Sequence, residues 1–190
     1  MNYFNGFNQH NDLKGKHAFL SPSNYHWLNY GIDKLRDTYR NSKAVELGTK
    51  LHDFACKAIE LGIKQQAIPK TLNMYINDAI GYKMNPEQPL YFSRNCFGTA
   101  DAIVFRRKQL RIHDLKTGTI PASMKQLHIY AALFCLEYDM KPESITFELR
   151  IYQNNECLID NPDPAVIRAT MDQIILCDSE IEKLRKEEGL

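Results

Sequence analysis

Residues 98–116, GTADAIVFRRKQLRIHDLK, are the part of the sequence from which the fold can best be predicted. It contains two runs of β-branched and large apolar residues, 99–105 and 110–116, on either side of a short basic segment. Runs of this length and composition predict two strands joined by a tight turn. We therefore expect a β-hairpin that belongs to a small sheet.

The basic segment between the two runs sets the pairing register. A turn centred after Arg107 pairs Arg106 with Gln109, and counting back places Asp101 directly opposite Asp114. The segment lacks Asn and Gly, which two-residue turns favour, but a four-residue loop with the same centre preserves the pairing. In either case the two carboxylates share one face, roughly 5 Å apart at Cβ.

One face of the predicted hairpin ends in two acids and a lysine. Alternation places Asp101, Asp114 and Lys116 together. The two acids repel each other, and burial adds a desolvation cost of several kcal/mol per ion. Lys116 supplies one compensating charge, and a divalent cation held by oxygen ligands would supply the rest. An ordinary ion-pair cluster of the same residues is the alternative interpretation.

Outward from the hairpin, the sequence predicts helices before it and alternating elements after it. We expect an α/β (mixed α+β) fold, in which a small central mixed sheet of about five strands is flanked by helices. The predicted helices span 22–39, 43–61, 70–84, 121–138 and a C-terminal segment from 164, and the remaining strands span 90–96, 145–152 and 156–159.

The length of 190 residues predicts one domain. We expect a polar, loosely ordered N-terminus at 1–18, a helical part at 19–88, a catalytic sheet core at 89–160 and a C-terminal helix at 161–190. The formal net charge of +1 means that any nucleic-acid contact must come from a local basic patch. No apolar run reaches the roughly 18 residues of a membrane span, and no secretory signal is evident. Five widely spaced cysteines predict free thiols in a reducing cytoplasm.

Several short motifs resemble the PD-(D/E)XK nuclease superfamily, in particular its RecB-like exonuclease branch, which includes phage-encoded members. The motifs are GTAD at 98–101, DLKTG at 114–118, GTKLH at 48–52 and QLHIY at 126–130, and the segment 20–30 resembles the opening S-x-S segment of the branch. They occur in the family's order, and the resemblance covers roughly 19–153. It implies a restriction-endonuclease-like core with a helical N-terminal part.

The resemblance also implies roles for individual residues. His52, Asp101, Asp114 and the backbone carbonyl of Leu115 would hold Mg²⁺ or Mn²⁺, and the imidazole nitrogen favours Mn²⁺. Asp101, Asp114 and Lys116 would be catalytic, with Lys116 orienting water and stabilising the charge that develops on phosphate. The alternative for His52 is an ordinary helix histidine.

Two residues of the following helix would border the substrate. The resemblance implies that Gln126 contacts DNA or a metal-bound water and that Tyr130 supports it; packing of Tyr130 in the core is the alternative. Lys125 is a candidate phosphate contact. Some members of the branch bind an iron–sulfur cluster through four cysteines, but here the opening segment has none, so we expect no cluster.

These features together predict a metal-dependent deoxyribonuclease. It would be an exonuclease acting on DNA ends or single strands in recombination, repair or phage DNA metabolism. Its expected partners are DNA and, for processive duplex degradation, a helicase or recombinase subunit, with no membrane. The alternatives are a non-catalytic DNA-binding or assembly module that retains the fold, and a site-specific or structure-specific endonuclease.

Overall fold

The computed structural model describes residues 10–11 and 15–189. Much of the predicted loosely ordered N-terminus at 1–18 therefore lies outside the described residues. The chain divides into two compact units, Met1–Glu46 and Leu47–Leu190, and each is described by itself. The expectation of one domain over the whole chain stays a prediction.

In the first unit, a short 3₁₀ helix replaces the start of the helix predicted at 22–39. The 3₁₀ helix η2 spans Pro22–Asn29, and Asn24 within it has a non-helical backbone. The side chain of the N-cap residue Ser21 does not cap this helix, because its hydroxyl bonds to the Ser23 hydroxyl at 2.8 Å rather than to the backbone. Regular α-helix begins only with α1, at Ile32.

Helix α1 spans Ile32–Glu60 without the break predicted near residue 42. Ser42 and its neighbours favour a turn in isolation. Here the Ser42 hydroxyl donates to the Tyr39 carbonyl inside the helix at 3.0 Å, and Lys43 forms an ion pair with Glu46 one turn later. These local bonds accommodate the polar residues within one continuous helix.

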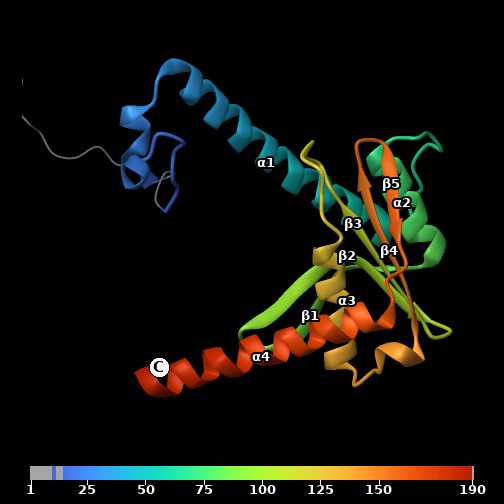
Figure 1. Cartoon of the computed structure of the whole chain (residues 1–190). Helices are drawn as coiled ribbons and strands as arrows, with labels where there is room; N and C mark the ends of the chain where they lie inside the picture. The colour runs from blue at the N-terminus through green and yellow to red at the C-terminus, as the bar shows by residue number, and fades with distance from the viewer. Residues whose placement is uncertain (1–9, 12–14, 190) are drawn as a thin grey trace, which may run out of the picture. The chain divides into compact units, whose positions relative to one another are not determined.

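The second unit is built on a five-stranded mixed sheet whose strands follow one another in chain order (Figure 1). Neighbouring strands are antiparallel except for β3 and β4, which are parallel and connected through helix α3. This arrangement confirms the predicted fold class. The strands are β1 (Asn85–Ser93), β2 (Cys96–Arg106), β3 (Gln109–Leu115), β4 (Thr146–Gln153) and β5 (Glu156–Asp160).

The β2–β3 hairpin has the predicted register. Arg106 lies opposite Gln109, and the pairing continues in step to Ala102 and His113, so the next positions in line are the two acids. Two residues make the turn, Arg107 with φ 50° and Lys108 with φ 62°. Both adopt the left-handed conformation that such turns need, although neither is Gly or Asn.

Strand β1 begins five residues earlier than the start predicted at 90. It runs from Asn85 through Pro86 and Pro89. It tolerates both prolines because it is an edge strand that pairs only with β2. The predicted end was also wrong, since Cys96 already belongs to β2.

Helices cover both faces of the sheet in this unit. The C-terminal part of α1 and helix α2 (Thr71–Tyr82) pack against one face, and α3 (Lys125–Glu137) and α4 (Pro164–Glu188) pack against the other. A 3₁₀ turn, η3 (Pro142–Ser144), precedes β4. Among the described residues, no helix combines the length and the apolar character needed to cross a membrane.

The helix starts differ in how well local sequence predicts them. Helix α4 starts as expected, with the Asp163 carboxylate accepting a hydrogen bond from the Ala165 amide at 2.8 Å. Helix α3 starts at Lys125 rather than at the predicted residue 121, because the preceding loop bonds to the side chain of Gln153.

Candidate metal centre

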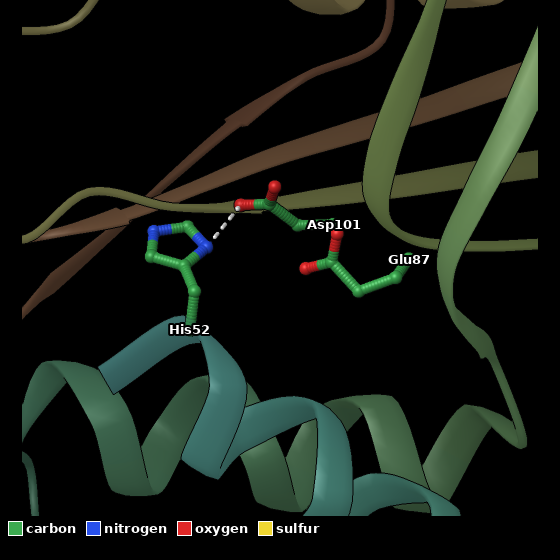
Figure 2. A group of neighbouring side chains, drawn as sticks. All are labelled: His52, Glu87 and Asp101. Carbon is green, nitrogen blue, oxygen red and sulfur yellow. Dashed lines mark ion pairs between the residues drawn. The ribbon is translucent and has the colours of Figure 1, made fainter. Parts of the chain in front are cut away.

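The C-terminal part of α1 brings His52 to the edge of the sheet. One turn before it, a Cβ atom on Gly48 would lie only 2.8 Å from Oγ1 of Thr117, so glycine allows the helix to approach the loop after β3. The His52 imidazole then lies beside Asp101 of β2, with 3.5 Å between Nδ1 and Oδ2 (Figure 2). The structure thus brings His52 to Asp101, and the role of this histidine as a metal ligand stays a prediction.

Glu87 of β1 completes a group of three potential metal ligands. His52, Glu87 and Asp101 each offer one atom, and these atoms lie within 4.8 Å of one another. Figure 2 shows the Glu87 carboxylate next to that of Asp101, with the imidazole on the other side. One nitrogen and carboxylate oxygens are a donor set suited to a divalent cation such as Mn²⁺ or Mg²⁺.

Glu87 is not among the ligands predicted from the sequence, because the predicted strand began only at residue 90, whereas β1 begins at Asn85. In the observed register Pro86 pairs with Ala102 and Gln88 with Ala100, so Glu87 lies opposite Asp101. Counting from the β1–β2 turn would still have missed this pair, because a register shift between Tyr91 and Ser93 moves the pairing by one residue. Glu87 has a positive φ of 48°, an uncommon conformation for a residue within a strand.

Without a bound cation, the carboxylates of the site repel one another. Burial is the main cause that raises the pKa of Asp101 to about 6, and the nearby Asp114 and Glu87 carboxylates add to it. The Leu115 amide, which donates to Oδ2 of Asp101 at 2.8 Å, and His52 both act to lower that pKa. Burial also raises the pKa of Glu87. A bound cation would stabilise the ionised form of these carboxyl groups.

Asp114 and Lys116 form an ion pair next to this group. Asp114 is 2% exposed, and the Lys116 ammonium lies 3.0 Å from Oδ1 and 2.9 Å from Oδ2. The ammonium is directed at Oδ1, and the buried Oδ2 accepts no well-oriented hydrogen bond from any described residue. This incompletely satisfied oxygen, together with the opposed carboxylates, fits a site that binds a cation. Asp114 lies outside the group of three, so its ligand role stays a prediction, as does that of the Leu115 carbonyl.

The Lys116 ammonium also bonds to a residue of helix α3. Oε1 of Gln126 accepts a hydrogen bond from Lys116 at 2.8 Å, and the Gln126 amide lies 3.5 Å from the Tyr130 hydroxyl. The Tyr130 ring packs against Gly98, where an added Cβ would come within 3.1 Å of the ring. A chain of polar contacts thus runs from Asp114 through Lys116 to α3.

Lys125 is separated from this chain of contacts. It lines an apolar groove of about 650 Å³ between α3 and α4, together with residues such as Ile129 and Ile174. Its predicted contact with DNA phosphate stays a prediction.

Tyr75 of α2 is a further residue near the site that the sequence analysis missed. Its ring is 2% exposed and packs edge-on against Tyr152, with 5.6 Å between centroids. Burial, followed by the charges of Asp101 and Glu87, raises the pKa of its phenol far above the usual value. Its hydroxyl is therefore neutral at any physiological pH.

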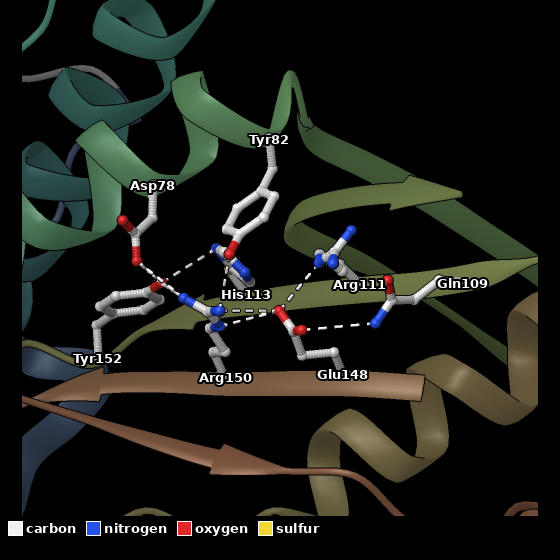
Figure 3. Close-up of polar contacts among 8 residues, drawn as sticks. All are labelled: Asp78, Tyr82, Gln109, Arg111, His113, Glu148, Arg150 and Tyr152. Carbon is white, nitrogen blue, oxygen red and sulfur yellow. Dashed lines mark hydrogen bonds and ion pairs between the residues drawn. The ribbon is translucent and has the colours of Figure 1, made fainter. Parts of the chain in front are cut away.

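Two further histidines, His113 and His128, have partners outside the group of three potential ligands. His128 pairs with Asp160 at 2.7 Å. His113 belongs to a polar network that joins α2 to β3 and β4 on the face opposite Asp114 (Figure 3). In this network the Tyr152 hydroxyl donates to Asp78 at 2.6 Å, and Arg150 bonds to Asp78 at 3.0 Å. These bonds fix helix α2, which carries Tyr75, against the sheet.

Comparison with known proteins adds one match. A family described as protein of unknown function (DUF2800) matches residues 87–161. The matched segment runs from Glu87 through the sheet and α3, and it includes Asp101, Asp114 and Lys116 but not His52. The match covers less than half of the chain. No curated protein matches the chain.

Proposed function

We propose that this protein is a metal-dependent deoxyribonuclease that hydrolyses phosphodiester bonds at DNA ends or in single strands. The observation that carries the proposal is the meeting of His52, Glu87 and Asp101 within 4.8 Å, beside the buried Asp114 and its ion-pair partner Lys116. Ligands for a divalent cation and a fixed ammonium are two features that promote phosphodiester hydrolysis.

The residues of the site would have two different roles, metal binding and stabilisation of the transition state. His52, Glu87 and Asp101 would hold the cation, which when bound activates water and neutralises phosphate charge. Lys116 contributes a positive charge that Asp114 and Gln126 hold in one place. A charge fixed in advance stabilises the developing negative charge of the transition state without reorganising. Because one ligand is an imidazole, we expect Mn²⁺ to support higher activity than Mg²⁺.

The resemblance to the RecB-like branch of PD-(D/E)XK nucleases supports the same proposal. His52, Asp101, Lys116 and Gln126 come from separate motifs, and the fold brings them to one end of the sheet. Glu87 is absent from those motifs and extends the ligand set. Exonuclease action, a helicase or recombinase partner and a cytoplasmic location are parts of the proposal that rest on the resemblance.

The test is DNA cleavage by the purified full chain. Labelled linear single-stranded, linear duplex and circular single-stranded DNA are incubated with Mn²⁺, Mg²⁺ or a chelator. We expect metal-dependent cleavage of linear DNA, and Lys116→Met should lower kcat by about 10²-fold to 10³-fold. Lys141→Met, which changes an exposed lysine just before η3, is the matched control.

Three outcomes would contradict parts of the proposal. DNA binding without cleavage in either metal would favour a non-catalytic DNA-binding or assembly module. Cleavage of circular DNA would identify an endonuclease. Equal activity of the wild type, Asp101→Asn and Lys116→Met would show that the nuclease is a contaminant.

A further inference from the structure

We propose that Gln153, the last residue of β4, is a positioning residue that fixes the Lys116 ammonium by holding the loop between Lys116 and Gln126. The inference rests on the proposed function, because it concerns the charge that would stabilise the reacting phosphate. The hydrogen bonds of the Gln153 side chain go to the loop and not to Lys116 or Gln126, so it would act through the loop.

The Gln153 side chain forms three hydrogen bonds with the backbone of this loop. It is 6% exposed, and its amide nitrogen donates to the carbonyls of Gly118 and Ile120, each at 2.7 Å. Its carbonyl oxygen accepts a hydrogen bond from the Ala122 amide at 3.0 Å. Both N–H groups and the oxygen of one side chain therefore bind three alternate residues of the same loop.

The loop depends on these bonds. Within the described part of the chain, residues 118–122 make no backbone–backbone hydrogen bond outside regular elements. They connect β3 to α3, and the helix starts only at Lys125. A buried amide that replaces missing backbone partners fixes the path of a segment that would otherwise have many conformations.

The two ends of the loop meet at the ammonium. At the start, the Lys116 amide donates to the Tyr152 carbonyl at 2.9 Å, so β4 holds the backbone of Lys116. At the other end, Gln126 in the first turn of α3 accepts from the Lys116 side chain at 2.8 Å. Gln153 binds the middle of the loop, and it therefore sets the distance between β3 and the first turn of α3.

Loss of the Gln153 bonds should release Gln126 from Lys116. The ammonium would then be held by Asp114 alone and would occupy several positions. Because an electrostatic group stabilises a transition state only when it is fixed in advance, kcat should fall while substrate binding changes little.

The experiment is a double-mutant cycle on the full chain. Gln153→Met keeps the length of the side chain and removes its hydrogen bonds, and Gln126→Met removes the acceptor for Lys116. We expect each single variant to lower kcat by about 10-fold to 100-fold with KM within about twofold. The double variant should be no slower than Gln126→Met, because both changes break the same link. Additive losses, or a Gln153→Met kcat equal to that of the wild type, would overturn the inference.

A second readout does not depend on activity. Hydrogen exchange in Gln153→Met should accelerate at Ala122 and also at the amides of Leu127 and His128 in the first turn of α3. Gln109→Met, which changes a strand glutamine at the opposite end of β3, should leave these amides unchanged. Faster exchange confined to Ala122 would show a purely local role and overturn the inference. If the wild type cleaves no DNA, the proposed function fails and this exchange pattern alone decides whether Gln153 positions α3.

Discussion

Asp101 is the residue on which the site converges. Its Oδ2 accepts a hydrogen bond from the Leu115 amide and lies 3.5 Å from the His52 imidazole, and Glu87 faces it from the neighbouring strand. The same carboxylate therefore links β3, α1 and β1. The Leu115 amide orients it, and burial together with the nearby Asp114 and Glu87 carboxylates favours its protonation unless a cation is present.

His113 should give the stability of the protein a distinct pH dependence. Burial, together with Arg150 and Arg111, lowers its pKa from 6.5 to about 3. Between these values the unfolded chain binds a proton that the folded protein does not, so the free energy of unfolding rises with pH. The slope is at most about 1.4 kcal/mol per pH unit.

Asp101 has the opposite effect on the pH dependence of the free energy of unfolding. The contributions of His113 and Asp101 must therefore be measured separately. Its pKa is raised from 3.8 to about 6, so between these values the folded protein binds more protons and stability falls as pH rises. Urea unfolding from pH 4 to 7 is therefore compared between Asp101→Asn and the double variant with His113→Asn. A slope that is equal in both proteins would refute the assignment to His113.

At the scale of elements, several helix ends and turns are bonded to side chains from distant parts of the chain. The N-terminus of α2 has no side-chain cap from its own sequence, and Asn155 of the β4–β5 turn accepts a hydrogen bond from the Thr71 amide at 3.1 Å instead. The β1–β2 turn is held to α4 by Asn95, which donates to Asp178 and Glu182 at 2.8 and 2.7 Å. Such bonds decide where elements start and how they dock.

The β2–β3 turn should be stabilised by glycine. Lys108 has φ 62°, a conformation that costs a residue with a Cβ roughly 1–2 kcal/mol and costs glycine little. After allowance for the greater freedom of glycine in the unfolded chain, Lys108→Gly should raise the free energy of unfolding by about 0.5–1 kcal/mol. Urea unfolding gives the value. Lys141→Gly is the control, since Lys141 has φ −78° and should not gain. Equal effects of the two substitutions would contradict the prediction.

At the scale of the folded unit Leu47–Leu190, the site lies where α1, β1 and β2 meet. A cation bound there would connect a helix to two strands in the folded state only. Ligand binding of this kind stabilises the folded protein, by about 2.7 kcal/mol when the free ion is present at 100 times its Kd.

Metal should therefore raise the Tm of the wild type and not that of Asp101→Asn. In a chelator the Tm of Asp101→Asn should equal or exceed that of the wild type, because the substitution removes one of the carboxylates that repel each other. Thermal unfolding with Mn²⁺ and with chelator measures both effects. Glu156→Gln, an exposed acid on β5, should respond to metal like the wild type. A wild-type Tm that is the same in both conditions would argue against the site.

The β2–β3 hairpin and the pairing of its acids could be predicted from the local sequence. Its register depends only on counting from the turn between Arg106 and Gln109, and alternation then assigns each residue to a face. The helix of His52 and the start of α4 at Pro164 were predictable for the same reason, because periodicity and capping are local.

Three features depend on how the elements pack together: Glu87 joins the site, α3 starts at Lys125, and Gln153 holds the loop before α3. The first depends on β1 being an edge strand that tolerates proline, and the others depend on a side chain 31 to 35 residues away from its partners. Contacts of that kind arise when separate elements pack together, and no local pattern of propensity or spacing encodes them.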